Sequence, residues 1–530
     1  MKAMKRRDFV ELMLLTGGWT MTAHATGTFD VEEKTVAELQ SAMQAGSTTS
    51  QQLVQLYLKR IAAIDKSGPK LNSIIELNPD ALAIAATLDA ERTATGARGP
   101  LHGIPVLIKD NIATADRMQT TAGSLALVGM QPPRDAALVA RLRKAGVVIL
   151  GKTNLSEWAN MRSTRSTSGW SARGGLTLNP YALDRNTSGS SSGSGSSVAA
   201  SLAAVAVGTE TDGSITSPAS VAGLVGIKPT VGLISRAGII PIAHSQDTAG
   251  PMARTLADAA ALLTVMAGGD GRDPATASAN TRKADYTQFL DRNGLQGRRI
   301  GVVRAQLLSS SDLVSALVES QLAVLITQGA TLVEVPEVPN VAKYGESELT
   351  VLLYELNADM AAYLADYGPN APIKTLADII DYNRKNSKAE MKFFGQEHFI
   401  NAQAKGGLDS QEYRDALANN HRYSRAEGID QVMEEHRLDA LVAPTCGPAW
   451  LTDFTNGDAS GGSFTSPAAV AGYPHITVPC GLVHGLPCGL SFVGRAWTEG
   501  PLIAMAFAYE QASLQRRAPT YAKSLNQQVD

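Results

Sequence analysis

The 530-residue chain contains few cysteines, carries little net charge and has no apolar run long enough to cross a bilayer. Its three cysteines, Cys446, Cys480 and Cys488, show no C-x-x-C spacing, so we expect buried thiols and not a disulfide framework. The formal net charge is −3 and no basic stripe occurs, which argues against nucleic acid as a partner. We also expect no membrane association of the mature chain.

Patterns that bind metals or cofactors are also missing. H-E-x-x-H does not occur, the Cys and His residues lack ligand spacing, and no well-formed dinucleotide or phosphate loop is present. None of the eight histidines stands in a recognisable motif, which leaves a Ser-His-Asp triad without its base. We therefore expect no metal and no cofactor.

The first 25 residues differ from the rest of the chain. They have a basic start, an apolar middle and the small-x-small ending Ala23-His24-Ala25, which is the layout of a secretory signal. Arg6-Arg7 followed by Asp8-Phe9 resembles a twin-arginine signal. We expect residues 1–25 to be an export signal and the protein to be periplasmic or secreted. The alternative is an amphipathic first helix of a cytoplasmic protein.

Alternating helix and strand patterns predict an α/β fold. Apolar residues recur at helical spacing from residue 35 to residue 65, with a break at residues 46–49 that has the residue types of a C-cap and an N-cap. "GIPVLIKD", residues 103–110, indicates a buried strand, and residues 135–154 and 298–335 repeat the alternation. We expect residues 26–525 to form one large domain with a mixed, mostly parallel, twisted sheet that helices cover on both faces.

From residue 341 to residue 436 the pattern becomes polar and helical, which predicts a largely helical insertion on the substrate side. Short β-like runs return in "DALVAPTCGPAW", "HITVPCGL" and "CGLSFVGRA". No Pro-rich or charged linker separates these parts, so we keep the insertion within the single domain.

The serine- and glycine-rich stretch "NTSGSSSGSG", residues 186–195, allows three interpretations. A flexible linker fits the composition, but the stretch runs directly into "VAASLAAVAV", which we expect to be a buried helix. A nucleophile elbow fits G-x-S-x-G at residues 189–193, but Pro180, Asp184 and Asn186 stand where that turn needs an apolar strand. The third interpretation joins this stretch to the second turn-rich segment, "GTETDGSITSPAS".

Three separate segments together resemble the amidase signature family. They are "GSSSGSG" at residues 189–195, "TETDGS" ending at Ser214, and Lys109 at the end of "GIPVLIK". The family has G-G-S-S-G-G-S, G-T-D-x-G-G-S-I-R-x-P and a lysine in G-x-P-x-x-x-K-D, and the 24 residues from Ser190 to Ser214 match its spacing. The resemblance covers roughly residues 30–520.

The sequence departs from the family pattern at four positions. Ser188 and Ser192 stand where glycine is usual, Glu210 replaces an aspartate, and Asp212 replaces a glycine. "MRSTRSTSGWSARGG" and "TETDGS" look most like the peptide amidase branch, which removes the amide from C-terminally amidated peptides.

The resemblance implies a Ser-Ser-Lys triad with Ser214 as nucleophile, Ser190 as bridge and Lys109 as base. It further implies that backbone N–H groups hold the oxyanion and that neighbouring residues support the loop. The oxyanion hole would comprise Thr211, Asp212 and Gly213, and the supporting loop Gly189, Ser191 and Gly193. No metal residue is implied.

Elementary chemistry supports a lysine base at the end of a buried strand. Lysine acts as a base only when it is neutral, and burial lowers its pKa because the charged form loses hydration. Asp110 follows Lys109 directly, but successive strand residues point to opposite faces, so its carboxylate should point away.

We therefore predict a monomeric amide hydrolase that releases ammonia from carboxamides through an acyl-enzyme, with C-terminal amides of short peptides as substrates. Three alternatives stay open. The chain could hydrolyse fatty or aryl amides, act as an amidotransferase A-type subunit that needs a partner protein, or bind peptides without turning them over.

Overall fold

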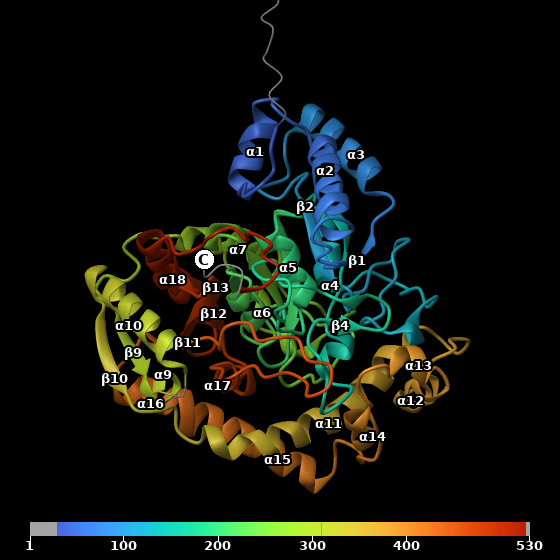
Figure 1. Cartoon of the computed structure of the whole chain (residues 1–530). Coiled ribbons are helices and arrows are strands. Elements are labelled where there is room, and N and C mark those ends of the chain that lie inside the picture. Colours follow the sequence, from blue (N-terminus) through green and yellow to red (C-terminus); the bar gives the residue numbers. More distant parts are fainter. Residues whose placement is uncertain (1–28, 309, 526–530) are drawn as a thin grey trace, which may run out of the picture. The chain divides into compact units, whose positions relative to one another are not determined.

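The computed structural model describes residues 29–308 and 310–525, and the export signal expected over residues 1–25 lies outside them. The chain divides after Asp30 into two units. The second unit begins at Val31 and contains every helix and strand described below (Figure 1).

An eleven-stranded mixed sheet runs through this unit in the order β1-β3-β2-β6-β8-β7-β12-β13-β11-β9-β10. A separate short hairpin pairs β4 with β5. The strands are β1 (Ile74–Leu77), β2 (Pro105–Lys109), β3 (Val148–Thr153), β4 (Trp170–Ser171), β5 (Gly175–Leu176), β6 (Val205–Glu210), β7 (Val225–Lys228), β8 (Thr248–Ala253), β9 (Arg299–Val303), β10 (Thr331–Val335), β11 (Ala440–Pro444), β12 (His475–Val483) and β13 (Leu486–Val493).

The mixed α/β sheet is confirmed, but it is not mostly parallel. Strands β3, β2 and β6 run parallel, as do β11, β9 and β10. The other six neighbouring pairs are antiparallel. Parallel strands need a crossover connection, whereas only His484 and Gly485 separate β12 from β13, so this pair must form an antiparallel hairpin. The alternation of helices and strands therefore predicts parallel pairing only for strands that a crossover connection joins.

Helices cover both faces of the sheet, as expected. In β12 and β13, Gly481 lies against Leu317 of α10, whereas Gly489, which faces the other way, lies against Ser220 of α6. Figure 1 labels the helices in the order in which they occur along the chain. The helices are α1 (Val36–Gln44), α2 (Ser50–Arg60), α3 (Ala81–Thr95), α4 (Ala137–Lys144), α5 (Ser192–Ala199), α6 (Thr216–Val221), α7 (Leu256–Met266), α8 (Ala279–Arg282), α9 (Arg304–Leu308), α10 (Asp312–Thr327), α11 (Val341–Ala365), α12 (Leu376–Lys385), α13 (Ser387–Glu390), α14 (Glu397–Gln403), α15 (Gln411–His421), α16 (Asp430–Glu435), α17 (Ser466–Ala471) and α18 (Glu499–Ser513).

Local capping explains where the first two helices begin. Thr35 and Thr49 each accept a hydrogen bond from the backbone N–H three residues later, and the side chains of Glu38 and Gln52 accept from the backbone N–H groups of the two threonines. These reciprocal capping boxes satisfy N–H groups that a helix start leaves free. The expected break between two helices at residues 46–49 is confirmed.

The serine- and glycine-rich stretch enters a packed helix, which excludes the flexible linker. Helix α5 begins within the stretch at Ser192 and ends at Ala199, and every residue of the helix is buried. The expectation of a helix throughout "VAASLAAVAV" was wrong, because Val205–Glu210 forms the central strand β6. A short apolar run that is buried on all sides fits either a helix or a strand, so the periodicity of its residues does not distinguish the two.

Helix α5 and the turn before α6 approach the sheet closely because the central strands carry glycine there. A Cβ at Gly208 of β6 would lie 2.8 Å from Ser191 Oγ. A Cβ at Gly250 of β8 would lie 1.9 Å from the carbonyl oxygen of Ile227 in β7 and 3.0 Å from Ile215 Cδ1 in the turn before α6. Larger side chains at these positions would push apart the segments that carry the site residues discussed below.

Residues 341–435 supply helices α11 to α16, drawn in yellow and orange in Figure 1. Apolar residues of α11, α12 and α14 pack against core residues that include Trp158, Ile240 and Ile242. The fully buried Arg162 adds a polar anchor, since its guanidinium contacts Glu157 and Glu390. The helical segment is therefore fixed to the core on the side of residues 158–162 and 240–242.

Replacing Gly250 with alanine is expected to lower the free energy of unfolding by about 1–3 kcal/mol, the usual cost of overpacking a core. Thermal or denaturant unfolding measures the change. Gly271→Ala is the matched control, because a Cβ there meets no atom within 4 Å. Equal stability of the two variants would contradict the close packing.

Candidate active site

The segments that the sequence singles out meet at one edge of the sheet. Strands β2 and β6 are parallel neighbours, so their carboxyl ends lie together. Lys109 is the last residue of β2, and the turn from Thr211 to Ser214 directly follows β6. The loop that carries Ser190 leads into α5, which contacts β6.

Lys109 is fully buried, with 0% of its surface exposed. Its Nζ lies 2.8 Å from Ser190 Oγ, 2.9 Å from Thr209 Oγ1 and 3.2 Å from the carbonyl oxygen of Thr209. Burial lowers the pKa of Lys109 to about 7, although the negative charges of Asp247 and Glu210 oppose the shift. The expected neutral amine at the end of an apolar strand is therefore available near neutral pH.

Asp110 points away from Lys109, as the strand geometry predicts. Its carboxylate accepts hydrogen bonds from the Thr121 hydroxyl and the Gly123 N–H, and it forms an ion pair with Arg173. The residue next to the amine in sequence therefore does not act as its counter-ion.

The loop around Ser190 is held by backbone contacts on two sides. The Ser156 N–H donates to the carbonyl oxygen of Ser190 at 3.1 Å, and the Ser191 N–H donates to the carbonyl oxygen of Ser214 at 3.1 Å. Ser191 Oγ also donates to the carbonyl oxygen of Thr209 and accepts from its N–H. Ser191 thus joins the serine loop to β6 and to the Ser214 turn. The peptide bond between Gly189 and Ser190 is cis.

Gly189 and Gly193 stand where the loop touches other chain segments. A Cβ at Gly189 would lie 2.1 Å from Ser156 Oγ, and one at Gly193 would lie 2.2 Å from the carbonyl oxygen of Ser73. A side chain at either position would displace Ser190. This geometry supports the supporting-loop assignment, which remains a prediction.

The turn after β6 presents free backbone donors beside Ser214, whose residue surface is 8% exposed. Within residues 29–308 and 310–525, the N–H groups of Thr211, Asp212 and Gly213 donate to no acceptor. Gly213 has a φ of +74°, a conformation that glycine adopts without strain. The turn therefore leaves three backbone donors without a partner close to Ser214, and their assignment as an oxyanion hole stays a prediction.

Glu210 is a brace for this turn that the sequence did not reveal. Its carboxylate accepts from the N–H groups of Ile215 at 2.7 Å and Thr216 at 2.9 Å. These bonds fix the chain directly after Ser214. The sequence marked Glu210 only as a departure from the family pattern, because a contact five residues along a turn has no periodic signal.

Asp247 is a second residue that sequence reasoning missed. It accepts from the Thr211 hydroxyl and from the N–H groups of Ile242 and Ala243. Burial raises its pKa to about 6. Asp247 thus ties the turn after β6 to the loop at residues 239–247, and its charge opposes the lowering of the Lys109 pKa more strongly than that of Glu210.

Two adjoining cavities open beside these residues. Ser190, Thr209, Thr211 and Asp247 help to line the first cavity. The second cavity shares Asn111, Ala159, Ile240 and Ile242 with the first and is otherwise mostly apolar. Its further lining residues are Ala122, Trp158, Pro241, Leu356, Met360 and Phe399. Helices α11 and α14 of the helical segment therefore form part of the wall next to the candidate site.

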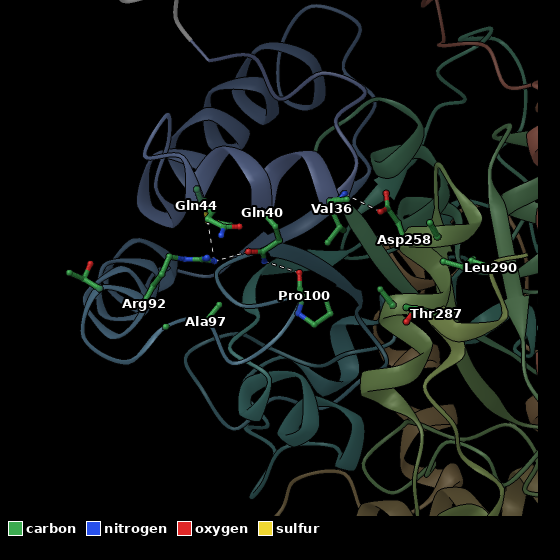
Figure 2. A pocket seen from close by; sticks show the side chains of 15 residues that line it. Val36, Gln40, Gln44, Arg92, Ala97, Pro100, Asp258, Thr287 and Leu290 are labelled. Atoms are coloured by element: carbon green, nitrogen blue, oxygen red, sulfur yellow. Dashed lines mark hydrogen bonds between the residues drawn. The ribbon is translucent and has the colours of Figure 1, made fainter. Parts of the chain in front are cut away.

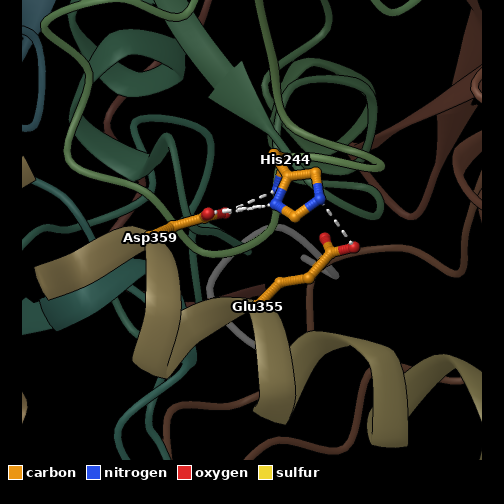
Figure 3. A group of neighbouring side chains, drawn as sticks. All are labelled: His244, Glu355 and Asp359. Carbon is orange, nitrogen blue, oxygen red and sulfur yellow. Dashed lines mark hydrogen bonds and ion pairs between the residues drawn. The ribbon is translucent and has the colours of Figure 1, made fainter. Parts of the chain in front are cut away.

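His244 connects α11 to the loop at residues 239–247 (Figure 3). Its Nδ1 lies 2.9 Å from Asp359 Oδ2, and its Nε2 lies 3.3 Å from Glu355 Oε1. One donor atom from each residue lies within 4.8 Å of the others, as a metal site would require. However, the two carboxylates face opposite ring nitrogens, so the arrangement is that of a histidine held between two acids.

A wider cleft lies away from this site, between α1, the loop at residues 96–100 and α7 (Figure 2). Gln40 and Arg92 bond to each other and to nearby carbonyl groups in its wall, and Asp258 accepts from the Val36 N–H. None of the predicted site residues lines this cleft. Its size alone does not make it the functional site.

None of the helices in residues 29–308 and 310–525 has the length and apolarity needed to cross a membrane. The three cysteines are all buried and free, as the sequence predicts.

Comparison with known proteins gives a consistent result. A family model described as Amidase matches residues 52–503. A solved structure of the peptide amidase PAM, bound to the competitive inhibitor chymostatin, has a TM-score of 0.90 and 54% identity, covering 93% of this chain and 100% of that one. An Arabidopsis thaliana protein named "Probable amidase" is 42% identical over 521 residues, 96% of each chain. A glutamyl-tRNA(Gln) amidotransferase component of Halorhodospira halophila is 36% identical over 501 residues, covering 91% of this chain and 98% of the relative.

The His244 contacts predict a pH-dependent contribution to stability. Burial and the charge of Arg236 lower the pKa of His244, but the Asp359 hydrogen bond and the charges of Glu355 and Asp359 outweigh them and raise it above 6.5. A raised folded-state pKa stabilises the fold below pH 6.5, and that stabilisation is lost as pH rises through the raised value.

We expect His244→Gln to lower the unfolding temperature more at pH 6 than at pH 9. Thermal unfolding of both proteins across this range measures the difference. His484→Gln, at an exposed position, is the control. A destabilisation by His244→Gln that is the same at both pH values would reject the charged clamp.

Proposed function

This chain belongs to the amidase signature family and is an amide-hydrolysing enzyme, and we propose that it hydrolyses the C-terminal carboxamides of short peptides to release ammonia. The observation that carries the proposal is the 2.8 Å contact between the buried Lys109 amine and Ser190, beside the turn of Ser214. The similarity to a peptide amidase over almost the whole chain supports this substrate class.

The contacts of Lys109 suit both protonation states of the amine. Lys109 Nζ has two oxygen atoms of Thr209 and one of Ser190 within 3.2 Å, so the protonated amine donates one N–H to each of them. In the proposed neutral state, two N–H groups donate to Thr209 and the lone pair accepts the Ser190 hydroxyl proton. Ser190 is then ready to take a proton from Ser214 as it passes its own to Lys109.

In the proposed reaction, Ser214 Oγ attacks the amide carbonyl carbon while its proton moves to Ser190 and the Ser190 proton moves to Lys109. The carbonyl π-electrons move to oxygen, and the resulting oxyanion accepts hydrogen bonds from the N–H groups of Thr211, Asp212 and Gly213. Removing one such donor typically raises the barrier by about 3 kcal/mol.

The C–N bond then breaks as Lys109 returns its proton through Ser190 to the leaving nitrogen, and ammonia departs. The remaining acyl group is esterified to Ser214. Water attacks this ester while its proton follows the same path to Lys109, and the relay then reprotonates Ser214 Oγ as the carboxylic acid is released. The cycle needs no oxidant, reductant or added group.

Trp158, Leu356, Met360 and Phe399 line an apolar cavity of about 10 Å³, which is room for no more than one water molecule. We propose that an apolar side chain of the substrate contacts these residues when they move apart, with the carboxamide near Ser190. Fatty and aryl amides could use the same cavity and are the second candidate class. An amidotransferase role, suggested by the amidotransferase relatives, would require a partner protein.

We further propose that the protein acts as a monomer in the periplasm or outside the cell. The proposed location rests on the signal-like composition of residues 1–25. An exported enzyme would meet peptide amides directly and would not supply ammonia to a cytoplasmic partner.

Ser214→Ala is expected to reduce ammonia release from an amidated dipeptide by about 10⁴-fold or more, because the nucleophile is removed. Ser217→Ala, in the same segment, is the control and should retain most of the activity. Unchanged ammonia release by the Ser214 variant would exclude this residue as the nucleophile.

The pH dependence of kcat/KM is expected to follow Lys109. Since the base must be neutral and its pKa is about 7, kcat/KM should fall about tenfold per pH unit well below pH 7. Lys109→Met should remain folded, as thermal unfolding can check, and should be inactive at every pH. A flat profile between pH 5.5 and pH 8, or an active methionine variant, would reject lysine as the base.

A further inference from the structure

Asn111 carries an unsatisfied polar atom beside the proposed relay. The residue follows Lys109 by two positions and is only 3% exposed. Its Nδ2 donates to Thr209 Oγ1 at 3.0 Å, and the same oxygen accepts from Lys109 Nζ at 2.9 Å. The other end of the amide, Asn111 Oδ1, is buried and has no hydrogen-bond partner among the residues that the structure describes. Buried polar groups are almost always satisfied, so this oxygen points to a missing partner.

A small polar cavity lies where that partner would bind. Asn111, Ser190, Thr209, Thr211 and Asp247 help to line it. Its volume is about 10 Å³, which is room for one molecule of the size of water and too little for a substrate side chain. Because Thr209 holds the Nδ2 end of the Asn111 amide, Oδ1 is the polar atom that Asn111 can offer to an occupant. An occupant of this cavity also lies next to Ser190.

The polar groups of the wall define the occupant. Asn111 Oδ1 is an acceptor only, and Asp247 Oδ1 accepts a single hydrogen bond, from the Thr211 hydroxyl, which leaves it a second lone pair. Ser190 has a proton to donate at the step in which the proposed leaving group departs. The occupant must therefore be a small group that donates N–H or O–H bonds to the wall and accepts a proton from Ser190.

The nitrogen of a carboxamide has these properties once the tetrahedral intermediate has formed. In the planar amide its lone pair is delocalised into the carbonyl group, whereas in the intermediate the lone pair is localised and can take a proton. An acceptor that holds one N–H fixes the direction of this lone pair. With that N–H on Asn111, the lone pair faces Ser190 and takes its proton. The C–N electron pair then moves to nitrogen, the carbonyl group re-forms and ammonia leaves.

We propose that Asn111 and this cavity form the subsite for the leaving nitrogen of the carboxamide, with Asn111 Oδ1 as the acceptor of one of its N–H groups. The proposal rests on the proposed function, because it places the reacting nitrogen next to Ser190. It also assigns a specificity to the site. A cavity of this size takes an NH₂ group and leaves no room for a substituent, so primary carboxamides are preferred over N-substituted amides.

Steady-state kinetics with three substrates that form the same acyl-enzyme test the subsite. They are N-acetyl-Gly-Phe-amide, its N-methylamide and its methyl ester, and chromatography measures the common product acid. We expect the unmodified enzyme to prefer the primary amide over the N-methylamide by about a hundredfold in kcat/KM, because the extra methyl group overfills the cavity.

Asn111→Ala removes the acceptor and enlarges the cavity. The value of kcat/KM for the primary amide should fall about tenfold, the usual effect of one lost hydrogen bond. The value for the N-methylamide should stay constant or rise, and that for the methyl ester, which has no N–H to hold, should change little. Asn293→Ala, at an exposed position, is the control and should leave all three values unchanged. Thermal unfolding checks that each variant is folded.

Asn111→Asp is the conservative variant, because it keeps an acceptor oxygen and the volume of the side chain. The new carboxylate near Lys109 raises the pKa of the amine, so the pH profile of kcat/KM should move to higher pH. At alkaline pH the preference for the primary amide should be retained. An Asn111→Asp enzyme that loses this preference would contradict the acceptor role.

Two results with Asn111→Ala would overturn the subsite. One is a preference for the primary amide that survives the substitution. The other is an equal fall for both amides and the ester, which is the behaviour of a residue that holds the hydrolytic water or only supports the relay. Ammonia release by the unmodified enzyme separates these outcomes from a failure of the proposed function. If neither this amide nor Gly-Phe-amide releases ammonia, the proposed reaction itself is rejected.

Discussion

The burial of one amine is the constraint on which the rest of the site depends. Lys109 can be a neutral base only if no carboxylate forms an ion pair with it, and the fold directs each nearby acid elsewhere. Asp110 turns to Arg173, Glu210 accepts backbone N–H groups after Ser214, and Asp247 accepts from Thr211 and the loop at residues 239–247. The acids that could pair with a charged Lys109 instead bind the surrounding turns. The same contacts therefore keep carboxylates away from the amine and fix the turns of the site.

Close approach of backbone segments is the second requirement. Lys109, Ser190 and Ser214 come from a strand end, a loop and a turn that are far apart in sequence. Ser191 bonds to Ser214 and to Thr209 of β6, and Lys109 bonds to the same Thr209. This approach is possible because Gly208 and Gly250 leave room on the sheet for the serine loop and the turn before α6. The high content of glycine and serine that resembles a flexible linker is therefore the composition of a tightly packed loop, in which small side chains permit contact and hydroxyl groups satisfy buried backbone atoms.

Sequence patterns predicted what depends on local order. The buried strand ending at Lys109, the two capped N-terminal helices and the opposite orientation of Asp110 follow from periodicity and residue type, and the three candidate catalytic residues follow from the family resemblance. The antiparallel centre of the sheet and the end of α5 at Ala199 could not be predicted, because buried strands and buried helices share the same apolar composition. The roles of Glu210 and Asp247 also depend on strand neighbours that only the folded chain brings together.

The residues of the proposed reaction and the residues that would select the substrate lie on different parts of the structure, and the second group lies partly on helix α11. The proposed relay residues lie at the carboxyl ends of β2 and β6, whereas α11 contributes Leu356 and Met360 to the wall of the apolar cavity. His244 fixes the middle of the same helix to the core. Because Leu356 and Met360 lie about one turn apart on this helix, we propose that they limit which apolar group an amide substrate can present. Substitutions in α11 can therefore alter which amide fits without changing the environment of Lys109.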